Sequence, residues 1–275
     1  MKDLFEELQL LMQKYRFKPS KKLSQNFLVS RQFIERIVLA AELKDKDIVL
    51  EIGCGTGFLT REILKHCSVV GFETDEILQK VLEAEIAAKN FRLFKQDFLK
   101  AELPEFSKIV SSPPYNISSD IMHSLFKLDF ESGVLLFEKA FVEKITSLPG
   151  FRDYCATAVL TQYFFETTII GEVPSDAFFP QPKTTSQIIG LEKSKKHGIA
   201  ENDLLFEQFV EQLFRYKNKN LGNALNYTED WVKAKLRTPN KALEDFLESS
   251  ELAGVKVYLI EVEEFVKVFN QLCNA

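Results

Sequence analysis

The chain has 275 residues, of which 45% are apolar and 27% charged, and its formal net charge is -5. This composition excludes a disordered or fibrous protein, and the length suits one large domain with a smaller one. The apolar runs are far shorter than the roughly 20 residues that span a bilayer, and the first residues do not form a signal peptide. Because the four cysteines also lack zinc-site or disulfide spacing, we expect a cytoplasmic protein that needs neither a membrane nor a metal.

The first predicted elements are a helix and a basic arm, which together cover residues 1–30. Apolar residues recur at helical spacing from Leu4 to Tyr15, and the stretch that follows holds Lys18, Lys21 and Lys22. A second helix is predicted around residues 33–41. Residues 47–52 then read as a buried strand that ends at the glycine-rich turn Gly53-Cys54-Gly55-Thr56-Gly57, a strand–turn–helix order that can cradle an electron-rich ligand.

Strands alternate with helices through the following 140 residues or so. Further strands are predicted at residues 68–73, 91–95, 108–111, 133–137, 164–173 and 185–191, and helices at 75–89, 119–128 and 140–148. Alternation of this kind builds a parallel sheet with helices on both faces. We therefore predict an α/β domain with a seven-stranded, mostly parallel sheet over residues 1–192, followed by a small helical domain over residues 193–275.

Acidic residues follow the second and third strands of the series. Glu73, about 20 residues after the glycines, is placed to accept hydrogen bonds from both ribose hydroxyls of a nucleoside cofactor. Asp97 is placed to accept from an adenine amine with Phe98 beside the ring, although a lone Asp at a strand end is more often a helix cap. These features fit a nicotinamide cofactor as well as other adenosine-containing cofactors.

The fourth strand ends in Ser111-Ser112-Pro113-Pro114-Tyr115-Asn116, a sequence that a dehydrogenase does not need. Methyl transfer to an aromatic amine requires the nitrogen lone pair to point at the methyl group of the donor. The Ser112 hydroxyl and the Pro113 carbonyl can accept the amine hydrogens, while Tyr115 stacks on an extruded base. An isolated P-P-Y is more often a turn that closes a strand, but its place in this series favours methylation of a base amine.

With these motifs in order, the chain from about Lys18 to beyond Leu225 resembles the KsgA/RsmA-type dimethyladenosine transferases of small-subunit ribosomal RNA. The resemblance implies a Rossmann-like methyltransferase dependent on S-adenosylmethionine (SAM). Residues 21–28 resemble the family's L-G-Q-[NH]-F-L signature. By this resemblance the cofactor contacts are Gln25, Asn26, Leu28, Gly53, Gly55, Glu73, Thr74, Asp97, Phe98 and Ser112.

Two later segments extend the resemblance. Residues 177–183, followed by Ser186, resemble the family's F-[YF]-P-x-P-K-x-x-S element, which implies that Phe178 or Phe179 sandwiches the target adenine against Tyr115. Residues 214–221 resemble the helix that opens the family's RNA-contacting domain. The implied RNA contacts are Lys18, Lys21, Lys22, Lys183, Arg215, Lys217 and Lys219, although basic runs are more often a solvated surface.

The chain departs from the family pattern at two positions. The family usually has N-L-P-[YF] where this chain has Ser112 to Tyr115, so a shorter hydroxyl replaces an amide, and slower transfer or arrest after one methyl is a plausible consequence. The sequence S-P-P-Y also resembles the motif of cytosine-N4 DNA methyltransferases. The second departure is Phe137-Glu138-Lys139, where the family usually has Q-K-E or a close variant. Glu138 adds a negative charge near the predicted cleft.

The first hypothesis is therefore a monomeric, SAM-dependent enzyme that methylates adenosine N6 in small-subunit rRNA within a ribosomal precursor particle. A methyltransferase for large-subunit rRNA or another nucleic acid is the alternative with the same chemistry. A ribosome-assembly factor with little turnover and a nicotinamide-dependent oxidoreductase are the alternatives from other classes.

Overall fold

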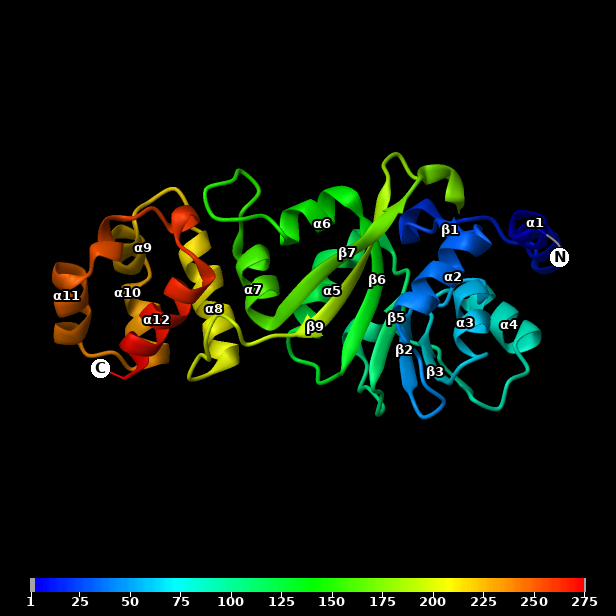
Figure 1. Cartoon of the computed structure of the whole chain (residues 1–275), viewed down its shortest axis with the longest axis horizontal. Coiled ribbons are helices and arrows are strands. Elements are labelled where there is room, and N and C mark those ends of the chain that lie inside the picture. Colours follow the sequence, from blue (N-terminus) through cyan, green and yellow to red (C-terminus); the bar gives the residue numbers. More distant parts are fainter. Residues whose placement is uncertain (1–2, 275) are drawn as a thin grey trace. The chain divides into compact units, whose positions relative to one another are not determined.

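The computed structural model describes residues 3–274, which fold into two compact units (Figure 1). The first unit comprises the residues up to Val142 together with Thr167–Lys193, and the second comprises Glu143–Glu166 together with the residues from Ser194 onward. The chain therefore leaves the first unit, contributes residues 143–166 to the second, and returns. This division differs from the single boundary near residue 192 that the sequence indicated.

The first unit is built on a seven-stranded sheet, as expected, and the strand order is β4-β3-β2-β5-β6-β9-β7. Strands β2 to β6 run parallel to one another, and β9 pairs antiparallel with β6. In order along the sheet the strands are β4 (Phe91–Phe94), β3 (Ser68–Phe72), β2 (Ile48–Ile52), β5 (Lys108–Ser111), β6 (Ser132–Glu138), β9 (Ser186–Lys193) and β7 (Phe165–Val173). The strand order reverses between β2 and β5, and ligands of open α/β sheets bind at such a switch point.

Helices pack against this sheet because their apolar residues recur on one face. Leu8 of α1 and Ile34 and Ile37 of α2 share one buried cluster with Val49 of β2 and Val110 of β5. The helices before β7 are α1 (Leu4–Tyr15), α2 (Arg31–Ala40), α3 (Phe58–Ile63), α4 (Glu76–Glu85), α5 (Ser118–Leu125), α6 (Lys139–Ile145) and α7 (Ala156–Phe164). The basic arm leads through a 3₁₀ turn (Lys21–Leu23) into β1 (Phe27–Leu28), which pairs antiparallel with β8 (Phe178–Phe179).

Helix α7 was not predicted, because apolar residues occupy it on nearly every side rather than on one face. Seven of its nine residues are buried. The Tyr163 ring lies 4.5 Å from that of Phe206, and the Tyr154 hydroxyl, just before the helix, donates to the Ile260 carbonyl at 3.0 Å. These contacts explain why residues 143–166 belong to the second unit.

The second unit is otherwise helical, as the sequence predicted. Its core is aromatic: Phe206 and Phe209 of α8 lie 5.4 Å and 5.5 Å from Phe269 of α12, and all three rings are fully buried. Its further helices are α8 (Asp203–Phe214), α9 (Leu221–Tyr227), α10 (Glu229–Trp231), α11 (Asn240–Ser249) and α12 (Val262–Cys273). Within residues 3–274, no helix combines the length and the apolar character needed to cross a bilayer.

Candidate functional site

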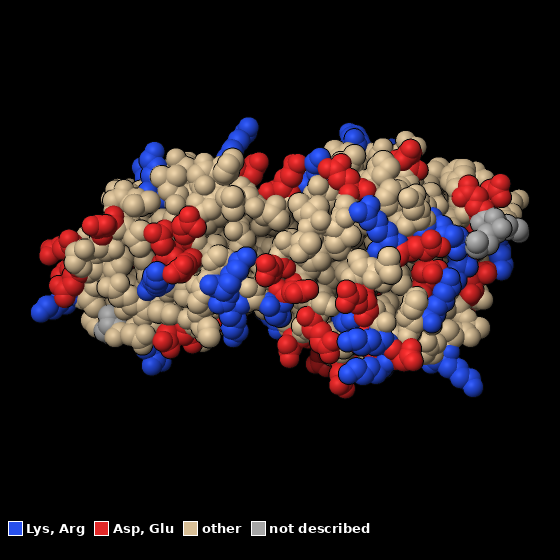
Figure 2. All heavy atoms as spheres, in the orientation of Figure 1, with Lys and Arg blue, Asp and Glu red and all other residues tan. Residues whose placement is uncertain are grey.

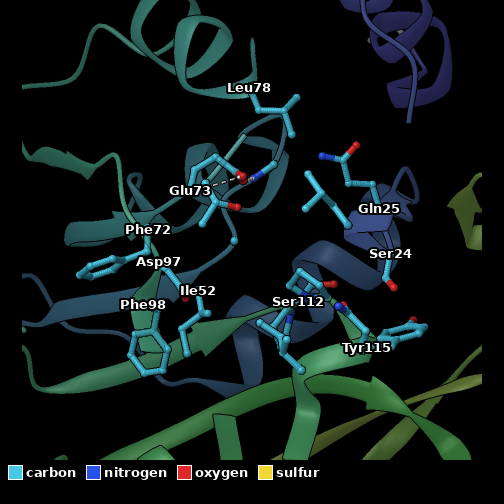
Figure 3. A pocket seen from close by; sticks show the side chains of 18 of the residues that line it. Ser24, Gln25, Ile52, Phe72, Glu73, Leu78, Asp97, Phe98, Ser112 and Tyr115 are labelled. Carbon is cyan, nitrogen blue, oxygen red and sulfur yellow. Dashed lines mark hydrogen bonds between the residues drawn. The ribbon is translucent and has the colours of Figure 1, made fainter. Parts of the chain in front are cut away.

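A cavity of about 240 Å³ opens where β2, β3, β4 and β5 end, at the switch point of the first unit (Figure 3). The loops after these strands form most of its wall, and the segment Leu23–Phe27 closes another side. The wall contains eleven of the predicted site residues: Gln25, Asn26, Gly53, Gly55, Glu73, Thr74, Asp97, Phe98, Ser112, Pro113 and Tyr115. Residues that lie as much as 90 positions apart in the chain therefore face one space.

The glycine turn allows the cavity to form. Gly53 has a φ of 75°, and a Cβ atom there would lie 3.2 Å from Cδ of Pro114, so a side chain would both strain the turn and crowd the proline motif. Gly55 has a φ of 58°, and its N–H donates to Oε2 of Glu73 at 2.8 Å. The turn after β2 and the acid after β3 are thus joined directly.

Glu73 is held as an acceptor that faces the cavity (Figure 3). Its Oε1 accepts from the N–H groups of Thr74 and Asp75 at 2.8 and 2.9 Å, while Oε2 accepts only from Gly55. Burial raises the pKa of Glu73, and these three N–H groups oppose that shift only in part. Since a carboxylate oxygen can accept two hydrogen bonds, Oε2 keeps a position for a hydroxyl donor such as that of a ribose.

Asp97 caps a turn and also lines the cavity. Its Oδ1 accepts from the Leu99 N–H at 3.0 Å and so caps the short turn after β4, while the residue also lines the cavity. Phe98 beside it is buried and packs edge-on against Phe72 with ring centroids 5.9 Å apart. The cavity wall thus contains a carboxylate and an aromatic ring on consecutive residues.

The segment before β1 shapes the cavity by binding to the rest of the unit. Gln25 donates from Nε2 to Oδ2 of Asp75 at 3.0 Å and accepts from the Ser20 N–H at 2.7 Å, so both ends of its amide are occupied within the protein. Asn26 donates to the Ser24 carbonyl at 3.3 Å and lines the cavity. Leu28 does not line the cavity, because in β1 it pairs with Phe178 and is buried in the core.

The proline motif is fixed at both ends. Before it, the Ser111 hydroxyl accepts from the Ile52 N–H at 3.2 Å and donates to the Ile52 carbonyl at 2.7 Å, which joins the ends of β5 and β2. After it, the Tyr115 hydroxyl forms a 2.5 Å hydrogen bond with Oγ of Ser186 on β9. Between these points, the hydroxyl of Ser112 lines the cavity and has no hydrogen-bond partner within residues 3–274. Asn116, at the end of the motif, also lines the cavity without a hydrogen-bond partner within residues 3–274, so the motif presents two unoccupied polar side chains to a ligand.

Tyr115 is a neutral phenol in this setting. Burial chiefly raises its pKa to about 12, although the hydrogen bond with Ser186 acts in the opposite direction. Glu138, which lies opposite Ser186 in the β6–β9 register and accepts from the Thr184 hydroxyl at 2.6 Å, also raises this pKa. Tyr115 can therefore stack on a base and form a hydrogen bond, but it cannot act as a base at neutral pH. Ser186 was not among the predicted site residues, although it ends the motif that contains Phe178 and Phe179.

The two phenylalanines lie outside the cavity wall, in contrast to the expectation that one of them sandwiches a base. Phe178 is 2% exposed and forms part of the core, since β8 pairs with β1. Phe179 is half-buried, and its ring packs edge-on against Phe5 of α1 at 5.3 Å. Phe178 therefore has no free face for a base.

Other cavity residues were missed by sequence reasoning. Most are apolar, and their positions would have been found only by asking which residues flank the predicted strand ends. They are Ile52, Phe72, Leu78, Gln96, Leu99, Asn116 and Ile117, together with Leu23, Ser24, Phe27 and Pro114. The apolar members provide the surface that a flat ring needs.

The predicted RNA contacts fall into both units. Lys18, Lys21, Lys22 and Lys183 are exposed in the first unit, and Lys21 and Lys22 belong to the turn whose last residue, Leu23, lines the cavity. In the second unit Arg215 and Lys219 are exposed, while Lys217 is half-buried and donates to the Arg152 carbonyl at 3.3 Å. Figure 2 shows basic and acidic residues interspersed on the visible face, so any nucleic-acid binding there depends on local groups.

Glu51 of β2 lies two residues before the glycine turn and makes a pH-dependent contribution to stability. It is 2% exposed, its Oε2 has no hydrogen-bond partner within residues 3–274, and burial raises its pKa from 4.5 to about 8. The folded protein therefore holds a proton that the unfolded chain loses, so the stability from this group falls as the pH rises from about 4.5 to about 8.

We expect Glu51→Gln, a neutral residue of the same shape, to remove this dependence. Thermal melts in mildly acidic and mildly alkaline buffers should show a smaller fall in Tm for the variant than for the natural protein. Glu83→Gln, which alters an exposed residue of α4, serves as the control and should follow the natural profile. Identical slopes for the natural protein and Glu51→Gln would contradict a protonated Glu51.

Comparison with known proteins identifies the family. A model of the family described as ribosomal RNA adenine dimethylase matches residues 16–262. A probable ribosomal RNA small subunit methyltransferase A of Thermococcus gammatolerans is 35% identical over 260 residues, which cover 94% of this chain and 91% of the relative. A protein of the same name from Pyrococcus furiosus is 33% identical over 273 residues, with 96% and 97% covered.

Solved structures agree with the predicted fold. A dimethyladenosine transferase from Plasmodium falciparum has a TM-score of 0.74 at 24% identity and covers 87% of this chain and 94% of its own, which shows the shared fold. The 23S rRNA methyltransferase ErmE has a TM-score of 0.65 at 28% identity, with 90% and 99% covered. The expected Rossmann-like methyltransferase fold is thus confirmed. The chain belongs to the ribosomal RNA adenine dimethylase family, a family of methyltransferases that use S-adenosylmethionine as methyl donor.

Proposed function

We propose that this protein transfers methyl groups from SAM to N6 of an adenosine in small-subunit rRNA. The observation that carries the proposal is that Ser112 and Tyr115 of the proline motif lie in the wall of the same cavity as Glu73 and Asp97. A nicotinamide enzyme has no use for that motif, and the family is one of adenine dimethylases. The names of the relatives support the small subunit as the source of the RNA.

The cavity residues have different roles in this proposal. Glu73 accepts from a ribose hydroxyl through Oε2, and Asp97 with Phe98 holds the adenine of the cofactor. When bound, SAM supplies an electrophilic methyl group, and its transfer leaves S-adenosylhomocysteine and releases a proton from the amine. Tyr115 stacks on the target base, while Ser112 and the Pro113 carbonyl accept the amine hydrogens and so aim the nitrogen lone pair. Alignment, rather than a strong base, is the chain's contribution, since Tyr115 is neutral.

Ser112 sets the number of methyl groups in this proposal. Its hydroxyl is shorter than the amide of the family pattern, so it holds the amine less firmly, and the bulkier monomethylated amine has fewer ways to align. We expect mainly monomethyladenosine from the natural protein and more dimethyladenosine from Ser112→Asn. The measurement is transfer of labelled methyl from SAM to undermethylated small-subunit particles, followed by mass analysis of the nucleosides.

Each other outcome has a definite meaning. Dimethyladenosine from the natural protein would show that serine suffices and would remove the limit at Ser112. Methylcytosine, or methylation of large-subunit RNA only, would assign another substrate. SAM binding by both proteins without product would favour the ribosome-assembly factor.

The physical setting of the enzyme is part of the proposal. We infer a monomer that acts on a ribosomal precursor particle in the cytoplasm. The net charge of -5 supports a particle as substrate, since the preassembled surface can supply contacts that bare phosphate attraction does not. The four free cysteines fit a reducing compartment.

A further inference from the structure

Three large apolar side chains lie exposed in the second unit on two segments of the chain. Leu148 and Phe151, in the loop between α6 and α7, are 57% and 65% exposed, and Leu259, before α12, is 44% exposed. A Cβ atom built on Gly150 would lie 3.5 Å from Cδ2 of Leu259, so the two segments are in contact. We call Leu148, Phe151 and Leu259 the Phe151 platform.

Backbone hydrogen bonds hold the platform in place. The Gly150 N–H donates to the Tyr258 carbonyl at 2.8 Å, and the Tyr258 N–H donates to the Lys217 carbonyl at 3.2 Å. Lys217 returns to the loop, because its Nζ donates to the Arg152 carbonyl at 3.3 Å. The loop is therefore bound to the segment after α8 and to the segment before α12, and Phe151 is exposed on a fixed support.

The segments that carry the platform have more basic than acidic residues. Arg152 follows Phe151 directly, and Lys256 is exposed with its Nζ 6.0 Å from the centre of the Tyr258 ring. The segments 148–153, 217–219 and 256–261 together carry four cations and two acids, namely Arg152, Lys217, Lys219 and Lys256 against Asp153 and Glu261. An exposed ring among cations is the chemistry that binds a single nucleic-acid strand, since the ring stacks on a base and the cations meet phosphates.

We propose that the Phe151 platform binds an unpaired base of the rRNA, with Phe151 stacked on the base and Arg152 and Lys256 beside its phosphates. The proposal rests on the proposed function, which requires an RNA substrate, and it adds a stacking contact in the second unit to the basic residues expected there. A duplex does not fit the platform, because its bases are already stacked and paired. A protein partner is disfavoured by the cations that flank the apolar residues.

The test uses the full-length protein and a labelled, unstructured RNA oligonucleotide, with a duplex of equal length for comparison. Phe151→Ala removes the ring on which a base would stack, so it should raise the Kd for the single strand about tenfold. Phe151→Tyr should retain nearly full affinity. Arg152→Gln and Lys256→Gln should each lower the dependence of binding on salt, because each removes one phosphate contact.

A matched control lies in the same unit. Leu204, in the first turn of α8, is 54% exposed, and Leu204→Ala should leave RNA affinity unchanged. Unchanged affinity in Phe151→Ala, equal losses in Phe151→Ala and Leu204→Ala, or a loss for the duplex as large as for the single strand would each overturn the platform. A Phe151→Ala protein that keeps its oligonucleotide affinity but loses particle binding would assign the surface to a ribosomal protein instead, and would also overturn it.

These failures are distinguishable from failure of the proposed function. Methyl transfer by the natural protein is measured separately on particles. This measurement tests the proposed function without any substitution at Phe151. The melting temperature of each variant is measured to check that the variant is folded. Phe151→Ala should melt at nearly the natural temperature, because Phe151 is exposed and its replacement leaves the core intact.

Discussion

Glu73→Ala is expected to weaken SAM binding about 10-fold to 100-fold. A hydrogen bond to a charged group contributes about 1.5–3 kcal/mol, and a ribose hydroxyl would lose its acceptor on Oε2. Each tenfold change in Kd corresponds to about 1.4 kcal/mol, so the loss of one such bond gives this range. The N–H groups of Gly55, Thr74 and Asp75 would also lose the carboxylate that orients them. Calorimetric titration with SAM measures the effect directly.

Two further variants separate binding from folding. Glu73→Gln keeps the shape of the side chain but offers only one acceptor oxygen, so it should bind SAM with an affinity between those of the natural protein and Glu73→Ala. Glu83→Ala changes an exposed acid of α4 that pairs with Lys95 and should leave SAM affinity unchanged. A folded Glu73→Ala protein with nearly natural SAM affinity would show that the ribose lies elsewhere.

Tyr115→Ala is expected to lower the single-turnover rate of methyl transfer on the order of 100-fold or more, with little change in the Kd for SAM. Loss of a stacked base costs about 1–3 kcal/mol, and a small misplacement of the reacting nitrogen can cost a further factor of about 100. Rapid-quench measurements with undermethylated particles and saturating SAM report the rate. If Tyr115→Ala transferred methyl groups as fast as the natural protein, Tyr115 would not contact the target base.

The Tyr115–Ser186 hydrogen bond predicts a smaller, coupled effect. Tyr115→Phe keeps the ring and loses the 2.5 Å contact with Ser186, so a several-fold fall in rate follows from a net bond energy of about 0.5–1.5 kcal/mol. Ser186→Ala should produce a similar fall, and the double variant should be no slower than either single variant. Additive losses would mean that Ser186 acts on something other than the orientation of Tyr115. We therefore expect Ser186 to act as a positioning residue, with its effect in the rate rather than in the KM.

Local sequence patterns were enough to predict most of the strands and helices of the first unit. A buried strand, a glycine turn and an acid after the next strand have fixed positions in a parallel α/β sheet, so Gly53, Glu73, Asp97 and Ser112 could be assigned to one edge before any coordinates were known. The strand ends meet because parallel strands point the same way, and the cavity wall contains all four residues. Periodicity also identified the helices of the second unit, whose apolar residues face an aromatic core.

The sequence was not enough to predict contacts that depend on pairing between distant segments of the chain. By its motif, Phe178 resembled a residue that flanks the target base. Strand β8 pairs with β1, however, and in this pairing the Phe178 side chain points into the core, because alternate residues of a strand face opposite sides. Helix α7 escaped notice because its uniform apolar character shows no helical period, and only the surrounding second unit explains that character. In the same way, Ser186 became a site residue only when β9 paired with β6 and brought its hydroxyl to Tyr115.

The sequence by itself therefore determined the order along the chain of the seven strands of the main sheet, the fold class and the residue types at the cavity edge, since these depend on residue types at local spacings. The tertiary structure decided which aromatic rings are free, which hydroxyls are occupied and how residues 143–166 are shared between the units. The physical reason is that burial and hydrogen bonding are properties of the whole neighbourhood, and an amino-acid pattern specifies what a side chain can do but not what it meets.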